Sequence, residues 1–233
     1  VAAFGASYGS IFKNICQILK SNSTMQQVFT KGASNAASHQ ILLNFIAIIS
    51  IIIVIVSSIP SVQLMLKLKS DEGKGWLELL HAKPLSRTRL YLSYYLISAI
   101  SGILLWFVGI GSLIVTGNSV LDSANQLSYD LLWSSFAAFI PALLIMIGIT
   151  AVIVGFIPRF GSAMWLYIVY AVVAMYLGNL VDMPTWAKQY TPFAWVPKVP
   201  LKDFNGVTFS WMLIVAAILL VVGLYGYRRR DLK

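Results

Sequence analysis

The residues of this sequence whose types and spacing could do chemistry gather in one stretch, SDEGKGWLELLHAKPLSRTRL, residues 70–90. This stretch holds Asp71, Glu72 and Glu78, three of the chain's eight acidic residues, and the chain has no other glutamate. Clustered carboxylates can act as general acids and bases, ligate a metal ion, or pair with basic groups on a partner. The elements that surround the stretch decide among these possibilities.

Those elements are long apolar runs that carry no Asp, Glu, Lys, Arg or His. The chain is 58% hydrophobic and 11% charged, whereas ordinary soluble domains carry about 25% charge. Each run reaches the roughly 20 residues that a helix needs to cross a bilayer, and open strands are excluded because lipid cannot satisfy their backbone polar groups. The runs are residues 41–66, 90–116, 131–157, 160–181 and 207–227.

The opening residues 1–12, VAAFGASYGSIF, are apolar but too short to span a membrane, and we interpret them as the end of a sixth span. The sequence therefore predicts an all-α integral membrane protein, a six-helix transmembrane bundle whose first helix is truncated. We expect residues 1–233 to form a single transmembrane domain, a fragment of a longer chain. Short small-xxx-small patterns, Gly5 with Gly9 and Ala151 with Gly155, are candidate helix-packing faces.

The distribution of basic residues predicts the orientation. If residues 67–89 are cytoplasmic, eleven of the seventeen Lys and Arg residues, including all six arginines, lie on the inner side. This agrees with the positive-inside rule, and it explains the net charge of +9 without a nucleic-acid partner. The C-terminus is then cytoplasmic, and residues 13–40 and 182–206 are extracytoplasmic. The second of these segments is rich in Pro and aromatic residues, which favours an interfacial elbow over a gate for substrate.

Catalysis and direct ligand binding have little support in this topology. His39 and His81, the only histidines, lie on opposite sides and cannot share a metal ion. Cys16 has no histidine near it in sequence, and no phosphate-binding G-x-x-x-x-G-K-[ST] pattern occurs. We therefore expect no catalytic residue, no metal site and no cofactor bound by the chain itself.

Pairing with a partner is the remaining chemistry, and the stretch has the pattern of a short amphipathic helix. At about 100° per residue, four large side chains share one arc, while Asp71, Lys74 and Glu78 share the opposite stripe and Glu72 lies at the edge. The four are Leu77, Trp76, Leu79 and Leu80. The inner leaflet is negatively charged and favours Lys and Arg over acidic residues. This favours a protein-docking helix over one that lies on lipid.

The order of residues Asp71-Glu72-x-x-Gly75-x-x-Glu78 and the turn Pro84-Leu85-Ser86-Arg87 resembles a known motif. It is similar to the acidic coupling segment of bacterial ATP-binding-cassette type-2 exporter permeases, most closely the antibiotic and multidrug (polyketide-type) branch. The stretches YGSIF (8–12), TPFAWVP (191–197) and YRRRDL (227–232) agree, so the resemblance spans nearly the whole chain. Asp71 departs from the family's usual Glu, and Lys74 dilutes the acidic cluster.

The resemblance implies that residues 1–233 are a single transmembrane permease domain, the second half of a longer chain. This permease subunit would export drug-like or lipophilic substrates from a bacterial cell. A separate, dimeric cytoplasmic ATPase would use the ATP and push on the acidic segment, beside another permease half and membrane lipid. Asp71, Glu72 and Glu78 would meet basic groups of the ATPase. The other implied coupling residues are Gly75 for close backbone approach, Trp76, Leu77 and Leu80 for apolar anchoring, Pro84 for the turn, and Arg87 to fix the next helix.

Two other functions stay open from the residues. An ion-coupled secondary transporter usually holds ionisable side chains inside the membrane, and the five apolar runs have none. A membrane protein that binds an ATPase without transporting anything would need the same acidic segment.

Overall fold

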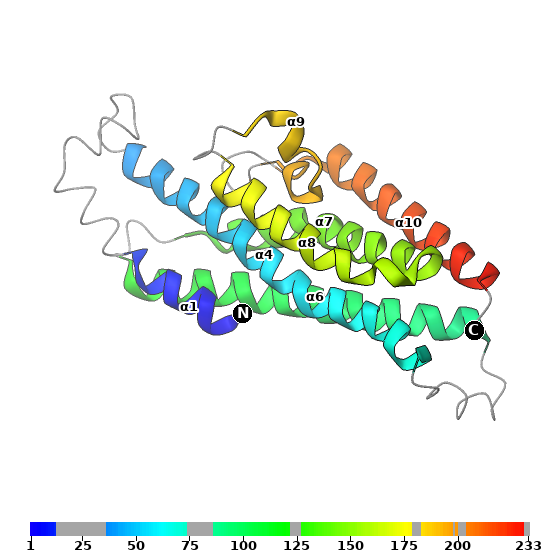
Figure 1. Cartoon of the computed structure of the whole chain (residues 1–233). Helices are drawn as coiled ribbons and strands as arrows, with labels where there is room; N and C mark the ends of the chain where they lie inside the picture. Colours follow the sequence, from blue (N-terminus) through cyan, green and yellow to red (C-terminus); the bar gives the residue numbers. More distant parts are fainter. Residues whose placement is uncertain are drawn as a thin grey trace. The chain divides into compact units, whose positions relative to one another are not determined.

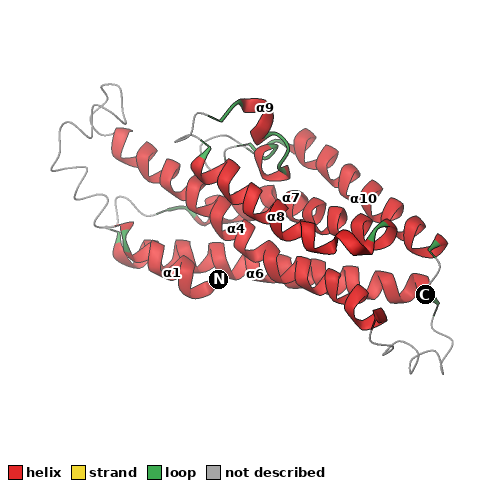
Figure 2. Ribbon diagram, in the orientation of Figure 1, coloured by secondary structure: helices red, strands yellow, loops and turns green. Residues whose placement is uncertain are grey.

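The structure is a computed structural model that describes residues 1–12, 36–73, 86–121, 127–178, 183–197, 199 and 204–230, without the side chains of residues 36–42. The described elements are helices, and no strand occurs among these residues (Figures 1 and 2). In chain order they are α1 (Ala2–Ser10), α4 (Ala36–Gly73), α6 (Arg87–Val120), α7 (Tyr129–Phe156), η2 (Pro158–Ser162), α8 (Ala163–Val172), η3 (Val173–Leu177), α9 (Thr185–Lys188), η4 (Pro192–Ala194) and α10 (Gly206–Arg229).

Five helical segments of the described chain are long and apolar enough to cross a membrane, which confirms the predicted all-α membrane fold. Their mean hydropathy over 18 residues lies between 1.7 and 2.7. They are Leu43–Gly73, Arg87–Val120, Tyr129–Phe156, Pro158–Leu177 and Gly206–Arg229. The first residues of the chain form the short helix α1, within the range 1–12 of the expected truncated span.

Helix α4 differs from its apolar run at one end. The run stops at residue 66, but the helix continues to Gly73, because residues 67–72 contain no Gly or Pro and Met65 and Leu68 are fully buried. Asp71 and Glu72 therefore lie in the last turn of a long helix, where the sequence suggested the start of a separate one. Residues 74–85, over which the amphipathic helix was predicted to continue, lie outside the described residues.

The chain divides into two compact units. The first contains Val1–Val54, Leu105–Phe139 and Pro197–Asn205. In this unit α1 packs closely on α6, since a Cβ on Gly5 would overlap the carbonyl oxygen of Gly109 and one on Gly9 would lie 2.7 Å from that of Leu113. The predicted packing face of Gly5 and Gly9 is thus confirmed.

The second unit contains Ile55–Leu104, Ile140–Val196 and Gly206–Lys233. Here α7 and α10 cross with their backbones in contact. A Cβ on Gly155 would overlap the carbonyl oxygen of Gly223, and one on Gly223 would lie 2.9 Å from the carbonyl oxygen of Ala151. The predicted packing face of Ala151 and Gly155 is confirmed, and its partner is a glycine face of α10.

The residues after α8 fold back onto it within the second unit. Tyr167 donates a hydrogen bond of 2.7 Å to the carbonyl oxygen of Tyr190, and Tyr170 donates one to that of Ala187. The elements here are the short helices α9 and η4, as the four prolines of this segment predict. Trp186, a residue of α9, is 63% exposed.

Candidate functional site

The candidate site is formed by the flanks of residues 74–85, where α4 ends and α6 begins, together with the end of α10. The end of α4, the beginning of α6 and the end of α10 all belong to the second unit. Asp71, Glu72 and Arg87 are described, and the structure shows their contacts. Six further residues of the predicted coupling set lie outside the described residues: Gly75, Trp76, Leu77, Glu78, Leu80 and Pro84.

Asp71 joins the last turn of α4 to the second turn of α6. Its side chain is buried, with 7% of the residue exposed, and Tyr94 donates a hydrogen bond of 2.6 Å from Oη to Asp71 Oδ2. Burial removes water from a carboxylate, and this costs free energy unless a hydrogen-bond donor replaces the water. Tyr94 therefore stabilises Asp71 in this position.

Glu72 forms an ion pair with Arg230, the residue that follows α10. The two side chains are 10% and 17% exposed, so water screens the pair only weakly. The planar guanidinium group has five donors in a fixed fork, and a second nitrogen, Nη1, donates a 2.7 Å hydrogen bond to the carbonyl oxygen of Val154 in α7. One side chain thus links α4, α7 and α10.

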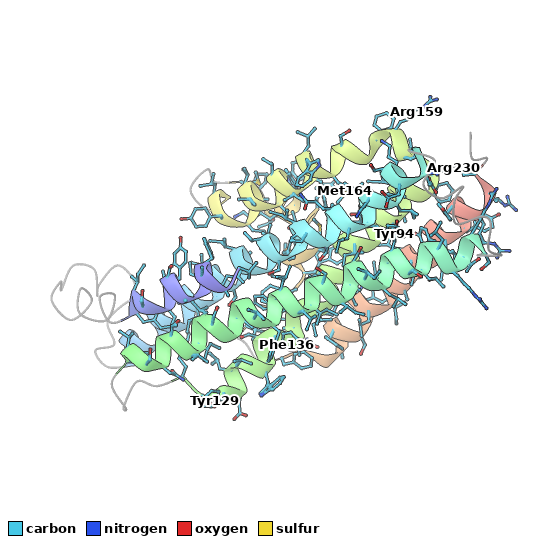
Figure 3. The ribbon with its side chains drawn as sticks, turned by 90° about the horizontal axis from the view of Figure 1, so that it is seen from below. Tyr94, Tyr129, Phe136, Arg159, Met164 and Arg230 are labelled. Carbon is cyan, nitrogen blue, oxygen red and sulfur yellow. The ribbon has the colours of Figure 1, made fainter. Side chains whose placement is uncertain are left out.

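Arg87 completes the cluster from the other flank. Its Nη1 donates a 3.2 Å hydrogen bond to the carbonyl oxygen of Arg230, one of the carbonyl groups that the end of a helix leaves without a partner. Arg230 therefore contacts a residue on each side of residues 74–85. Figure 3 shows Arg230 at this end of the unit, and it shows Arg159 pointing away from the helices.

Aromatic rings pack beneath the ion pair. Tyr91 and Tyr227 are almost completely buried, and their ring centroids are 5.2 Å apart. The guanidinium carbon of Arg230 lies 5.5 Å from the centroid of the Tyr227 ring, within the range of a cation–π contact. This apolar surrounding lowers the local dielectric and strengthens the pairing of Glu72 with Arg230.

This arrangement can hold helices together, through the hydrogen bond of Tyr94 to Asp71 and the ion pair of Glu72 with Arg230. Among the described residues no three His, Cys, Asp or Glu side chains are close enough to hold a metal ion. Cys16, His81 and the side chain of His39 lie outside the described part. Residues 5–9, GASYG, have the spacing of a nucleophile elbow, but that motif needs a turn from strand to helix. Here they lie within α1, where Ser7 donates to the carbonyl oxygen of Ala3.

The sequence identified Asp71, Glu72 and Arg87 but missed their partners Tyr94, Val154 and Arg230. The sequence analysis used the three terminal arginines only together, as part of the stretch YRRRDL and of the basic residues on the inner side. On the helical wheel of α10, Arg230 shares a face with Tyr227 and Gly223, three and seven residues before it, and the structure shows that both of those residues are buried. Arg228 and Arg229 lie on the exposed side.

The helices and this cluster define a multi-pass α-helical membrane protein in which an ion pair joins the end of α4 to the end of α10. The model of the family described as "Multidrug efflux system permease Rv1217c, C-terminal domain" matches residues 1–228. The chain belongs to this family, and the resemblance to multidrug exporter permeases is confirmed.

A curated relative supports the same assignment. The multidrug efflux system permease protein Rv1217c of Mycobacterium tuberculosis is 28% identical to this chain over 232 residues. The alignment covers 99% of this chain and 41% of the relative. The chain thus spans about two fifths of the length of the relative that it matches.

Proposed function

We propose that this chain is the transmembrane permease part of an ATP-driven exporter of the ATP-binding-cassette class. A separate, dimeric cytoplasmic ATPase hydrolyses ATP, and the permease moves a drug-like or lipophilic substrate out of a bacterial cell. The efflux activity is supported by the family to which the chain belongs. The coupling step is supported by one structural observation, the contact of Arg230 with both flanks of residues 74–85.

A segment that transmits motion must be fastened at both ends, because a free end would absorb the displacement. The first flank is fastened by the hydrogen bond between Tyr94 and Asp71 and by the ion pair between Glu72 and Arg230. The second flank is fastened by Arg87. A push on residues 74–85 would then reach α4, α6 and α10 together, and α7 through the carbonyl group of Val154.

This changes the proposed roles of the acidic residues. Asp71 and Glu72 have partners within the chain, so they hold the segment in place, and the ATPase is met by the residues between the flanks. Glu78 would supply the charge for that contact, and Trp76, Leu77 and Leu80 the apolar anchoring. Gly75 would permit close approach, and Pro84 would turn the chain toward Arg87.

The remaining parts of the proposal concern the surroundings of the chain. The permease lies in the bacterial cell membrane with residues 67–89 and the C-terminus in the cytoplasm, as the positive-inside rule requires. ATP is bound by the partner subunit alone. The other half of the permease and the lipid bilayer cover the apolar helix faces.

Transport and ATP hydrolysis measured together in proteoliposomes test the coupling step. The full permease is reconstituted with its ATPase, and the substrate moved per ATP hydrolysed is compared for unmodified protein, E72Q and R230Q. We expect hydrolysis to continue in both variants while the ratio falls several-fold, because the segment is released at its first flank. Arg230→Lys keeps the charge but loses the planar fork, and it should give an intermediate ratio.

Arg159→Gln is the matched control. Arg159 is an exposed arginine of the same unit that points away from the helices, and its replacement should leave the ratio unchanged. An unchanged ratio in well-folded R230Q would refute the coupling role. Transport that needs no ATPase and follows an ion gradient would identify an ion-coupled carrier, and tight ATPase binding without transport would identify a non-transporting partner.

A further inference from the structure

The three consecutive arginines at the end of α10 are divided between the inside and the outside of the second unit. Arg230 turns inward to Glu72 and Val154. Arg228 and Arg229 are exposed, and neither makes an ion pair with any residue that the structure describes. The guanidinium carbon of Arg229 lies 4.4 Å from the ring centroid of Tyr225, which fixes its direction along the helix surface.

Beside these two arginines is an open groove of about 420 Å³ on the surface of α10. Its lining combines apolar and cationic side chains, Val221, Leu224, Tyr225, Arg228 and Arg229. Val221 is 64% exposed and Tyr225 is 50% exposed. The groove therefore has an apolar wall at one end and two positive charges at the other.

The apolar wall continues along the helix away from the arginines. Exposed large side chains recur every three or four residues, which places them on one face. From Val207 to Arg228 this face is about 30 Å long at 1.5 Å per residue, the thickness of the hydrocarbon core. The face consists of Val207, Trp211, Ile214, Ile218, Val221 and Tyr225.

We infer that this groove binds an anionic phospholipid. The phosphate group lies against Arg228 and Arg229, and an acyl chain lies along Leu224, Val221 and the apolar face beyond them. Guanidinium groups match phosphate oxygens in charge and geometry, and basic clusters at the end of a membrane helix attract acidic headgroups. An extended peptide in the same place would leave its backbone polar groups against hydrocarbon.

Titration of the purified full-length permease with phosphatidylglycerol or phosphatidylcholine of identical acyl chains, followed by native mass spectrometry, tests this inference. The unmodified protein should bind phosphatidylglycerol more tightly. Arg228→Gln and Arg229→Gln should each lower that affinity about fivefold, and the double variant should lose the preference. Phosphatidylcholine binding should stay constant, and so should all values for R159Q, whose arginine is outside the groove.

A second experiment, photo-crosslinking in the cell membrane, identifies what lies on the groove. A photo-reactive amino acid at position 221 should form adducts with lipid, and Tyr225→Ala should lower the yield. If folded R228Q/R229Q protein binds phosphatidylglycerol as tightly as the unmodified protein does, the inference is overturned. Capture of the rest of the permease or of a second chain at position 221 would overturn it as well. Neither experiment uses ATP, so its outcome is separate from that of the coupling proposal.

Discussion

At the scale of single residues, Arg230 is the side chain on which the site depends most. Its charge pairs with Glu72, its second nitrogen bonds to the carbonyl oxygen of Val154, and its own carbonyl oxygen accepts from Arg87. Removing one partner of a buried ion pair typically costs about 3–5 kcal/mol, because the other charge is left buried without compensation. Both side chains are less than one fifth exposed, so this magnitude applies.

Single and double replacements of the pair should show this dependence in thermal unfolding of the detergent-solubilised permease. We expect E72Q and R230Q each to lower Tm by about 5–10 °C. The double variant should be less destabilised than the sum of the two, since no unpaired charge remains. Purely additive effects would contradict the pairing, and R159Q should stay within about 2 °C of the unmodified protein.

Tyr94→Phe tests the other contact of the first flank. The variant keeps the ring but removes the hydroxyl group that donates to Asp71, at a cost of about 1–3 kcal/mol for a buried group left unsatisfied. Tm should fall measurably and the coupling ratio should fall less than in R230Q. Tyr129→Phe is the matched control, because Tyr129 is 64% exposed. Equal Tm values for the two variants would show that the contact with Asp71 has no effect on stability.

The sequence could predict Asp71, Glu72 and Arg87 as members of this cluster but not Arg230. Asp71, Glu72 and Arg87 stand out because charges are rare in the chain and theirs adjoin long apolar runs. Arg230 is one of three adjacent arginines, and its separate role depends on which face of α10 packs against α7. That choice is made by contacts distant in sequence, such as Gly155 with Gly223.

At the scale of elements, the crossing of α7 and α10 carries Arg230 to its partners. The two backbones touch at Gly155 and Gly223, where no Cβ fits, and Gly148 lies against the side chain of Leu219. Ala151 and Gly155 could be recognised from their spacing of four. Gly223 and Gly226 are three residues apart, so the pattern used for Ala151 and Gly155 does not reveal them.

Glycine-to-alanine variants measure this crossing directly. Gly155→Ala should force α7 and α10 apart, with a cost of about 1–3 kcal/mol for overpacking and a lower Tm. Gly111→Ala is the control, because nothing lies within 4 Å of a Cβ there, and it should leave Tm equal or slightly higher. If both variants unfold at the same temperature, the close crossing is absent in the membrane.

At the scale of the whole molecule, composition alone predicted the class of fold. Uncharged runs of the length of a bilayer have few other interpretations, so the helices within Leu43–Gly73 and the four other spanning segments could be expected. The exact ends could not, because α4 continues through Lys67 and Lys69 as long as one face remains buried. Orientation came from the distribution of Lys and Arg, and the account of coupling depends on it.

Labelling of single cysteines with a membrane-impermeant maleimide tests the predicted orientation, and with it the account of coupling, most directly. In a C16S background, Trp76→Cys probes the coupling segment and Trp186→Cys, at an exposed aromatic residue, serves as the control for the opposite side. On intact cells we predict labelling at position 186 and none at position 76, which should react only in inside-out vesicles and be protected when the ATPase is bound. Labelling at position 76 from outside intact cells would contradict the account.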